Sequence, residues 1–267
     1  MALMQPLRSL LQGLRAIRRE ASVIVNLLDS GPDMLLRTDA ALTLEDRTAL
    51  IGFARDHGLP RVSRVDARDV PETIGLLRPP TTSLSGITVR PPHGAFLQAT
   101  VEGERAIINA VLRGMPVKIT SKTKVAELYS GCGTLTFALA RVMRVAAFEG
   151  DAATLAALKQ AINQGGAMAG RIEAFQRDLA RQPLSVKELG AFAAVVLDPP
   201  NGGAAAQIGH IAAAGVPTVV YVSCNPATLS RDARVLHGAG YKLTAVTAID
   251  QFLWSARLES VSVFRRG

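Results

Sequence analysis

Short apolar runs and amphipathic stretches alternate along the second part of the chain, from about residue 100 to the end. The apolar runs predict strands, at 124–129, 145–149, 171–176, 193–197, 218–223, 241–249 and 258–264. The amphipathic stretches predict helices, at 102–112, 134–143, 152–164 and 227–236. Such alternation is typical of a parallel sheet covered by helices. Ligands of these sheets bind beyond the carboxyl ends of the strands.

The last two predicted strands are joined by a short connection. Only nine residues, Asp250 to Leu258, lead from the end of one strand to the first residue of the next, which is too few for the crossover between two parallel strands. We therefore expect the final strand to run antiparallel. Its first residues then lie at the edge where the parallel strands end, and Glu259 is among them.

The part before residue 86 has the pattern of a small α+β unit. Strands are predicted at 22–28, 34–37 and 61–65, and a helix that begins after Thr43 is predicted at 44–57. Two proline pairs between residues 75 and 95 bracket the short strand-like run 87–90. We place a domain boundary there, with a small N-terminal unit over 1–85 and a second domain over 86–267.

Residues 1–19 are predicted to form an amphipathic helix, with leucines on one side and arginines on the other. A transit peptide or a membrane-surface helix has the same pattern. Helices of globular domains commonly have it too, and we expect a domain helix here. No run of about 18 uncharged apolar residues occurs, so the sequence predicts no membrane span.

The amino-acid composition excludes several classes of protein. A hydrophobic content of 48% excludes a disordered chain. The two cysteines, Cys132 and Cys224, are too few for a disulfide framework or a four-thiolate metal site, and they favour the reducing cytoplasm. The net charge of +8 favours a polyanionic partner such as nucleic acid, although ordinary basic solubility explains it equally well.

A glycine-rich turn joins the strand at 124–129 to the next helix. Gly131 and Gly133 let the backbone come close to a ligand, and the helix start at Thr134 offers free N–H groups. Thr136 occupies the place of the third glycine in a dinucleotide-binding fingerprint. The turn therefore favours a nucleoside over a pyrophosphate, although a plain tight turn has the same pattern.

Carboxylates follow the next two strands. Glu149 is placed to accept hydrogen bonds from both hydroxyls of a ribose. The alternative is a solvated carboxylate at the start of a helix. Asp178 follows the predicted third strand and could meet an adenine amino group.

Two further strand ends carry polar or reactive groups. Asp198-Pro199-Pro200 forms a stiff polar turn that can hold a planar base, and an ordinary helix-start turn is the alternative. Cys224 precedes a helix, whose N-terminus is expected to lower the pKa of its thiol. A small buried apolar role is usual for a free cysteine. The edge that Cys224 shares with Asp198 and Glu149 favours a reactive thiol instead.

Taken together, several motifs resemble the RNA 5-methyluridine methyltransferase family. They are, in order, Phe96-Leu97-Gln98, Gly131-Cys132-Gly133-Thr134, Asp198-Pro199-Pro200, Ser223-Cys224-Asn225-Pro226 and Glu259. The similarity covers about residues 85–267. The Ser-Cys-Asn-Pro motif followed by a late glutamate is specific, whereas any single motif is not.

The resemblance implies an α/β fold, a Rossmann-like class I methyltransferase domain whose mostly parallel seven-stranded sheet has an antiparallel last strand. It implies methyl transfer from S-adenosylmethionine to carbon 5 of a uridine in transfer or ribosomal RNA, with no metal. Cys224 is then the nucleophile that adds to carbon 6, and Glu259 the base that removes the carbon 5 proton. We expect cofactor contacts from Gln98, Tyr129, Gly131, Gly133, Thr134, Glu149, Asp178 and Asp198. We expect substrate contacts from Phe96, Asp198, Pro199 and Asn225.

The sequence departs from the family pattern in three places. Asn201 stands where the family usually has arginine, and Arg257 where histidine usually precedes the catalytic glutamate by two. Many members also carry an N-terminal RNA-binding β-barrel and a four-cysteine iron–sulfur site, and this sequence contains neither. Two alternatives stay open: a truncated or degenerate member that binds RNA and cofactor without turnover, and a methyltransferase acting on another base.

Overall fold

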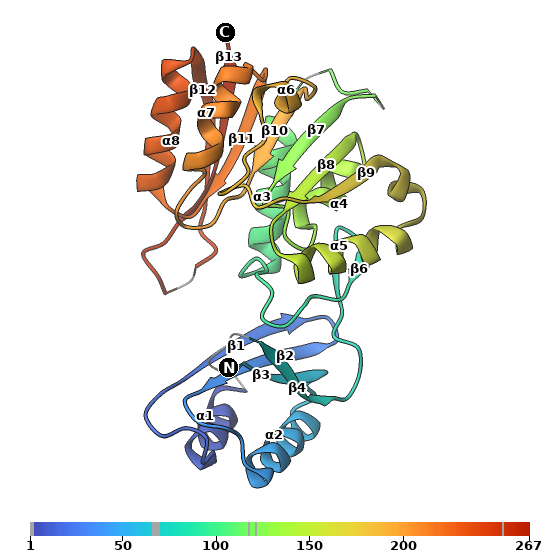
Figure 1. The fold of residues 1–267 in the computed structure, drawn as a ribbon, viewed down its shortest axis with the longest axis vertical. Helices are drawn as coiled ribbons and strands as arrows, with labels where there is room; N and C mark the ends of the chain where they lie inside the picture. Colours follow the sequence, from blue (N-terminus) through green and yellow to red (C-terminus); the bar gives the residue numbers. More distant parts are fainter. Residues whose placement is uncertain (1–2, 66–69, 117, 121, 253) are drawn as a thin grey trace. The chain divides into compact units, whose positions relative to one another are not determined.

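The computed structural model describes residues 3–65, 70–116, 118–120, 122–252 and 254–267. Figure 1 labels the helices and strands along the chain. The chain divides into two compact units, Met1–Ser83 with Thr88–Phe96 and Leu84–Ile87 with Leu97–Gly267. Each unit has its own hydrophobic core.

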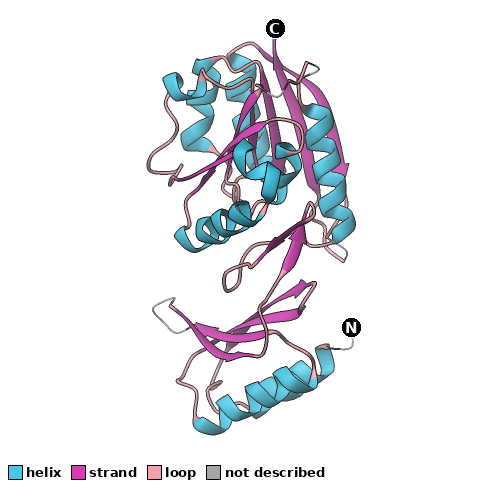
Figure 2. Cartoon of the chain, turned by 90° about the vertical axis from the view of Figure 1, so that its right-hand side faces the viewer, coloured by secondary structure: helices cyan, strands magenta, loops and turns pink. Residues whose placement is uncertain are grey.

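The first unit is a four-stranded sheet with two helices on one face (Figure 2). Across the sheet the strands follow chain order: β1 (Ala21–Leu28), β2 (Gly31–Thr38), β3 (Arg61–Val65) and β4 (Pro71–Leu76). The helices are α1 (Met4–Gly13) and α2 (Leu44–Asp56). Buried side chains of α2 and the sheet, such as Leu50 and Leu36, belong to one apolar cluster.

The ends of these elements show where local signals are strong and where they are weak. Thr43 begins α2 as predicted, because its hydroxyl accepts from the N–H of Asp46 at 3.1 Å and the Asp46 carboxylate accepts from the N–H of Thr43 at 3.0 Å. The predicted helix over 1–19 is too long, since α1 ends at Gly13 and Leu14 is already extended. Strand β4 is not predicted, because it is a mostly exposed strand that begins at Pro71.

A short hairpin, β5 (Thr82–Leu84) and β6 (Ile87–Val89), follows the four-stranded sheet along the chain. The run 87–90 was predicted as a strand from its sequence, whereas its partner β5 was not. The division between the two compact units passes through this hairpin.

The second unit contains a seven-stranded sheet with the order β12-β13-β11-β10-β7-β8-β9. Its strands are β7 (Lys124–Leu128), β8 (Arg144–Glu149), β9 (Ile172–Gln176), β10 (Ala194–Leu197), β11 (Thr218–Ser223), β12 (Tyr241–Ile249) and β13 (Glu259–Arg266). Strands β11, β10, β7, β8 and β9 pair in parallel, whereas β13 pairs antiparallel with β11 and β12. The antiparallel final strand is thus confirmed, and Glu259 is its first residue.

Helices cover both faces of this sheet. They are α3 (Val101–Gly114), α4 (Thr134–Ala140), α5 (Ala152–Gln164), the 3-10 helix η1 (Gly166–Arg171), α6 (Val186–Leu189), α7 (Ala205–Ala214) and α8 (Pro226–Gly238). Strand β11 shows the two faces. Tyr221 packs in the core with Ile208 of α7 and Leu236 of α8. The neighbouring Val220 lies against Gly114 of α3 on the other face.

Helices α7 and α4 also differ from the prediction. Helix α7 is not predicted, because Ala204 gives it no side-chain cap and its alanine- and glycine-rich sequence has a weak period. The helix predicted over 134–143 ends at Ala140, since residues 141–143 turn into β8. Among the helices that the structure describes, none is long and apolar enough to cross a membrane.

Candidate active site

The predicted site residues of the second unit lie along one edge of its sheet. Tyr129, Asp198 and Cys224 directly follow the carboxyl ends of β7, β10 and β11, and Glu149 is the last residue of β8. These strands pair in parallel with their neighbours in the sheet, so their carboxyl ends lie at the same edge. Because β13 runs the opposite way, Glu259 at its start lies at the same edge. The fold therefore brings the predicted nucleophile, base and cofactor loops together.

The glycine turn after β7 has a backbone that side chains would obstruct. Gly133 has a φ of +106°, and a Cβ there would lie 2.6 Å from the Phe137 ring and 2.8 Å from a methyl group of Leu158. Gly131 has a φ of +55°, and nothing lies within 4 Å of the place of its Cβ. Tyr129 adopts a φ of +63° although it is not a glycine. The turn is closely packed beneath Gly133 and open beside Gly131.

Glu149 and Asp178 are held by backbone N–H groups of nearby loops. One Glu149 carboxylate oxygen accepts from the N–H of Gly131 at 2.9 Å, and the other accepts from the N–H of Asp151 at 2.8 Å. Asp178 accepts from the N–H groups two and three residues further along the chain, at 3.0 and 3.1 Å. These bonds fix the orientation of both carboxylates at the strand ends. Their contacts with a cofactor stay predictions.

Glu127 is a buried acid that the sequence analysis did not single out. It lies inside β7 with an exposure of 2%, and within the described part of the chain its Oε2 has no hydrogen-bond partner. Burial raises its pKa to about 8, and the carboxylates of Asp198 and Glu149 act in the same direction. Burial therefore favours the protonated form of Glu127 relative to an exposed glutamate. The sequence signal that could have identified Glu127 is a glutamate inside an otherwise apolar strand.

A chain of side-chain amides connects two carboxylates on the other half of the edge. Nε2 of Gln98 donates to Oδ2 of Asp198 at 3.4 Å. Nε2 of Gln251 donates to Oε1 of Gln98 at 2.9 Å and to Oε2 of Glu259 at 3.2 Å. Gln98 was predicted from the family motif, whereas nothing in the sequence pattern marked Gln251.

Asp198 and Glu259, the two carboxylates connected by these amides, both have raised pKa values. Burial raises the pKa of Asp198 to about 7, and repulsion by the Glu259 carboxylate adds to the effect. Burial also raises the pKa of Glu259, and the hydrogen bond from Gln251 partly opposes it. A carboxyl group with a raised pKa is a stronger base than an exposed one, which suits a group that takes a proton.

Cys224 lies next to the end of the β11–β13 pairing, where the charge of Glu259 acts on it. Ser223 pairs with Ser260 across β11 and β13, so the next position along β11 is beside the start of β13. The thiol is free and partly buried. Burial raises its pKa, the carboxylates of Glu259 and Asp198 raise it further, and the positive charge of Arg257 partly compensates. The expected lowering by the helix N-terminus is therefore wrong for this structure, because burial and two carboxylates outweigh it.

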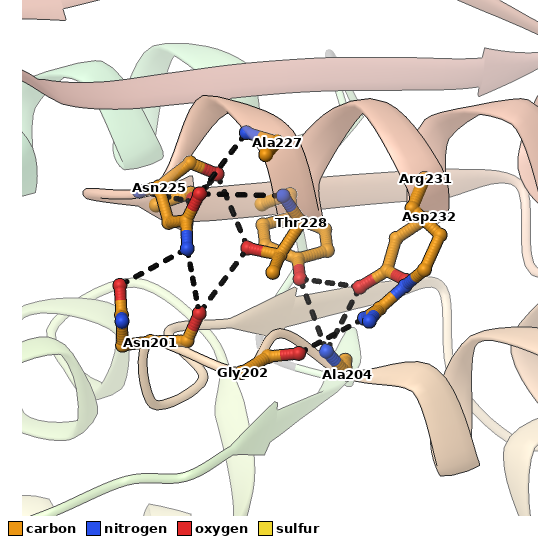
Figure 3. Close-up of polar contacts among 10 residues, drawn as sticks. Asn201, Gly202, Ala204, Asn225, Ala227, Thr228, Arg231 and Asp232 are labelled. Carbon is orange, nitrogen blue, oxygen red and sulfur yellow. Dashed lines mark hydrogen bonds and ion pairs between the residues drawn. The ribbon is translucent and has the colours of Figure 1, made fainter.

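Asn225 connects the loop of Cys224 to the loop of Asp198 (Figure 3). Its side-chain oxygen accepts from the N–H of Ala227 at 3.0 Å and from the N–H of Thr228 at 3.4 Å, which caps α8. Its Nδ2 donates to the backbone oxygen and to Oδ1 of Asn201, at 3.0 and 3.1 Å. Both ends of the amide are thus engaged by the protein. A direct contact of Asn225 with substrate stays a prediction.

Asp232 makes a second connection between α8 and the loop after β10 (Figure 3). Its Oδ2 accepts from the Tyr221 hydroxyl at 2.7 Å and from the N–H of Ala204 at 2.8 Å. Its Oδ1 pairs with Arg231 at 2.8 Å, and that guanidinium also donates to the backbone oxygen of Gly202 at 3.0 Å. The loop that follows Asp198-Pro199-Pro200 is therefore fixed to the helix that follows Cys224.

The remaining predicted residues have less specific surroundings. Thr134 is the first residue of α4, and Pro199 is buried. Phe96 belongs to the first unit, where its side chain is 76% exposed. Across the described residues, no group of three histidine, cysteine or acidic side chains is arranged to hold a metal ion. The roles expected of these residues stay predictions.

The comparison with family models decides the relationship. The model described as tRNA (Uracil-5-)-methyltransferase matches residues 86–266. The chain belongs to this family. The resemblance inferred from the glycine turn, the Ser-Cys-Asn-Pro motif and Glu259 is thereby confirmed.

Two relatives illustrate the similarity within the tRNA (uracil-5-)-methyltransferase family. An uncharacterised RNA methyltransferase of Rhizobium meliloti is 37% identical over 263 residues, which cover 95% of this chain and 61% of that protein. The 23S rRNA (uracil(1939)-C(5))-methyltransferase RlmD of Yersinia enterocolitica is 34% identical over 268 residues, which cover 98% of this chain and 58% of that protein. The chain thus spans about three fifths of the length of these relatives.

A solved structure shows the same fold. The tRNA (uracil-54, C5)-methyltransferase of Pyrococcus abyssi, in complex with S-adenosyl-L-homocysteine, superimposes with a TM-score of 0.68 at 16% sequence identity. The match covers 91% of this chain and 59% of that one. The predicted fold class is confirmed: a Rossmann-like class I methyltransferase domain with a mostly parallel sheet, accompanied by a small α+β unit.

Two departures from the usual family residues have structural counterparts. Asn201, in the place of the usual arginine, accepts both hydrogens of the Asn225 amide. Arg257, in the place of the usual histidine, is exposed, and its positive charge partly offsets the rise in the pKa of Cys224. The first substitution therefore supports the loop after Cys224, and the second acts on the thiol electrostatically.

Proposed function

We propose that this member of the tRNA (uracil-5-)-methyltransferase family methylates carbon 5 of a uridine in structured RNA, transfer or ribosomal, and that it acts in the cytoplasm. The main support is the pairing of β11 with β13, which sets Cys224 beside Glu259 at the ligand edge of the sheet. The net charge of +8 suits an RNA partner.

The cofactor loops have the chemistry that a nucleoside needs. Bound S-adenosylmethionine would supply an electrophilic methyl group. The open backbone at Gly131 and the oriented carboxylate of Glu149 fit its ribose and the adjoining chain. Glu127, next to the last residue of β7, offers a buried polar atom without a partner among the described residues. We assign cofactor contacts to Gln98, Tyr129, Gly131, Gly133, Thr134, Glu149, Asp178 and Asp198.

The substrate side carries the two reacting groups. Carbon 5 of uracil is a weak nucleophile, so the Cys224 thiolate first adds to carbon 6 and makes carbon 5 electron-rich. Carbon 5 then takes the methyl group. Glu259 removes the carbon 5 proton, the electrons of that C–H bond form the C5–C6 double bond, and the thiolate leaves. A base inside RNA must be unstacked first, which suits a uridine in a loop.

Covalent trapping tests this proposal directly. The protein and S-adenosylmethionine are mixed with bacterial tRNA and 23S rRNA transcripts that contain 5-fluorouridine. Fluorine cannot leave as a proton, so an adduct through Cys224 should persist on a denaturing gel. The band should vanish in Cys224→Ala and remain in Cys132→Ala, because Cys132 is only 3% exposed.

A negative result has a definite meaning. Absence of a band from the unmodified protein, with S-adenosylmethionine binding intact by calorimetry, would contradict uracil-C5 methylation by this chain. It would favour a family member that binds without turnover, or one that acts on another base. A band that survives Cys224→Ala would contradict the assignment of the nucleophile.

A further inference from the structure

Gln251 is a buried amide next to the proposed base. It lies in the connection between β12 and β13 and is only 3% exposed. Its Nε2 donates to Oε1 of Gln98 at 2.9 Å and to Oε2 of Glu259 at 3.2 Å. An amide nitrogen has two hydrogens, and both are therefore used.

The carboxylates at the two ends fix the direction of the chain of amides. Asp198 and Glu259 accept hydrogen bonds when ionised, so each must face an NH2 group. Gln98 turns its nitrogen to Asp198 and its oxygen to Gln251, and Gln251 turns its nitrogen to both Gln98 and Glu259. Reversing the Gln251 amide would set two oxygens against each other at Glu259 and again at Gln98. The hydrogen bonds of Nε2 therefore fix the orientation of the Gln251 amide, whose Oε1 is buried and has no hydrogen-bond partner among the described residues.

Helix α3 makes room for this amide. Gly103 lies in the first turn of α3, where a Cβ would collide with Oε1 of Gln251 and lie 2.7 Å from its Cβ. The N–H of Gly103 is held by the hydroxyl of Thr100, the N-cap of the helix, at 2.9 Å. The Gln251 side chain is thus confined by packing as well as by hydrogen bonds.

The two oxygens of Glu259 differ as a result. Oε2 accepts from Gln251, whereas Oε1 is buried and has no hydrogen-bond partner among the residues that the structure describes. A base must have a lone pair free to take a proton and must be held so that this lone pair meets its target. Glu259 has a tethered oxygen and a free one.

We propose that Gln251 is a positioning residue for the base: it holds Oε2 of Glu259 so that Oε1 takes the carbon 5 proton. This inference rests on the function proposed above. In the step concerned, Oε1 gains the proton, the C–H electron pair becomes the C5–C6 double bond, and Cys224 leaves carbon 6 as a thiolate. Gln251 keeps its two N–H bonds throughout and touches neither substrate nor cofactor.

The variant Gln251→Met tests this role, because methionine has a similar length but no N–H donor. Two rates are measured with RNA that contains 5-tritiated uridine: methyl incorporation into RNA and tritium release to water. We expect tritium release to slow about ten- to a hundredfold, since a hydrogen bond to a charged group is lost. Methyl incorporation in the first turnover should remain close to normal, so an adduct with unfluorinated RNA should accumulate.

The pH profile of tritium release gives a second reading. The bond from Gln251 favours the ionised form of Glu259, so its loss should move the rise of the profile to higher pH. Asp198, Cys224 and Arg257 also face this corner of the site and are unchanged in the variant. A merely structural loss would lower the rate at every pH without moving the profile.

Gln207 offers a matched control. It is a fully buried glutamine of α7, whose amide accepts from the N–H of Leu184 at 2.7 Å and donates to the oxygen of Leu184 at 3.1 Å. Gln207→Met also removes a buried amide, but on the helix side of the core. We expect it to lower the melting temperature while the ratio of tritium release to methyl incorporation stays normal.

The outcomes separate the two proposals. If the unmodified protein forms no adduct with 5-fluorouridine RNA, the proposed function fails and this inference fails with it. If it does, and Gln251→Met releases tritium at the normal rate or slows both rates equally, the role of Gln251 is overturned and the function stands. Should Gln251→Met not fold, Gln251→Asn is read in the same way, because its amide is one methylene too short for Glu259.

Discussion

The edge of the seven-stranded sheet at which the parallel strands end has two halves, and each half holds its carboxylates by different means. In the half formed by β7, β8 and β9, Glu149 and Asp178 accept from backbone N–H groups of adjacent loops. In the half formed by β10, β11 and β13, Asp198 and Glu259 accept from the side-chain amides of Gln98 and Gln251. The first half is suited to binding, because backbone donors fix its carboxyl groups in place. The second is suited to proton transfer, because Glu259 is buried, Asp198 is partly buried, and both have raised pKa values.

The strongest test of this difference removes one acid from each half. Glu259→Gln should slow turnover about a hundredfold to ten-thousandfold, because it removes a general base. It should leave the affinity for S-adenosylmethionine nearly unchanged. Glu149→Gln should weaken cofactor binding about tenfold or more, because it loses charge-assisted hydrogen bonds, and should keep turnover at saturating cofactor. Calorimetry and methyl-transfer kinetics measure the two effects.

An equal fall in saturated turnover for both variants would contradict this division. It would mean that the two halves act as one unit, with the carboxylate of Glu149 needed for the chemistry itself. A loss of cofactor affinity in Glu259→Gln would lead to the same conclusion from the other side.

A smaller effect is expected from the packing of the glycine turn. Gly133→Ala combines a left-handed backbone with contacts to Phe137 and Leu158 that are too close, and should destabilise the protein by about 2–4 kcal/mol. Gly131→Ala meets no neighbour and should cost about 1–2 kcal/mol, from the backbone alone. Urea denaturation gives both values. Similar losses in the two variants would show that packing beneath Gly133 adjusts to the extra methyl group.

The smallest effect concerns the cysteines, one in each half. Burial raises the pKa of Cys132 to about 12, and carboxylates of Glu149 and Asp151 contribute. Burial, then Glu259, also raises the pKa of Cys224 above its ordinary value of 9.0. Alkylation of Cys224 by iodoacetamide should therefore rise with pH up to and beyond about 9, because the thiolate reacts. In Glu259→Gln the rise should move to lower pH.

Mass spectrometry of the alkylated peptides reads each cysteine separately. Cys132 should stay unmodified over the same pH range and serve as the internal reference. A rate at Cys224 that is already at its plateau at neutral pH would show that the N-terminus of α8 dominates over burial and the carboxylates.

The half of the site formed by β7, β8 and β9 was predicted more fully, because its contacts join residues that are close in sequence. Glu149 is eighteen residues from Gly131, and its place at a strand end follows from the alternation of strand and helix. The place of Glu259 at the edge where the parallel strands end followed from the short connection before β13. Gln251 bonds to a residue 153 positions away, and no local pattern marks such a contact. The direction of the Cys224 pKa shift was wrong for the same reason, since it depends on groups brought together by the fold.

The fold shows the same limit. Strands with apolar runs, such as β10 and β11, were predicted because burial on both faces leaves a continuous apolar sequence. Helix α7 was not, because alanine and glycine give little contrast between its faces. Strand β4 was not, because an exposed strand needs no apolar alternation. The elements that carry the predicted site residues are those with strong patterns.

The regular ladder between β11 and β13 has a consequence for how this region can vary. Six residue pairs, from Thr218 with Arg265 to Ser223 with Ser260, fix the position of Glu259 relative to Cys224. The β-bulge lies on the other side of β13, in its pairing with β12. A shift of one residue in this ladder would turn Glu259 to the opposite face of the sheet. The connection over 250–258 can gain or lose surface residues without that effect. Changes of length among these surface residues would therefore leave the β11–β13 pairing and the position of Glu259 unchanged.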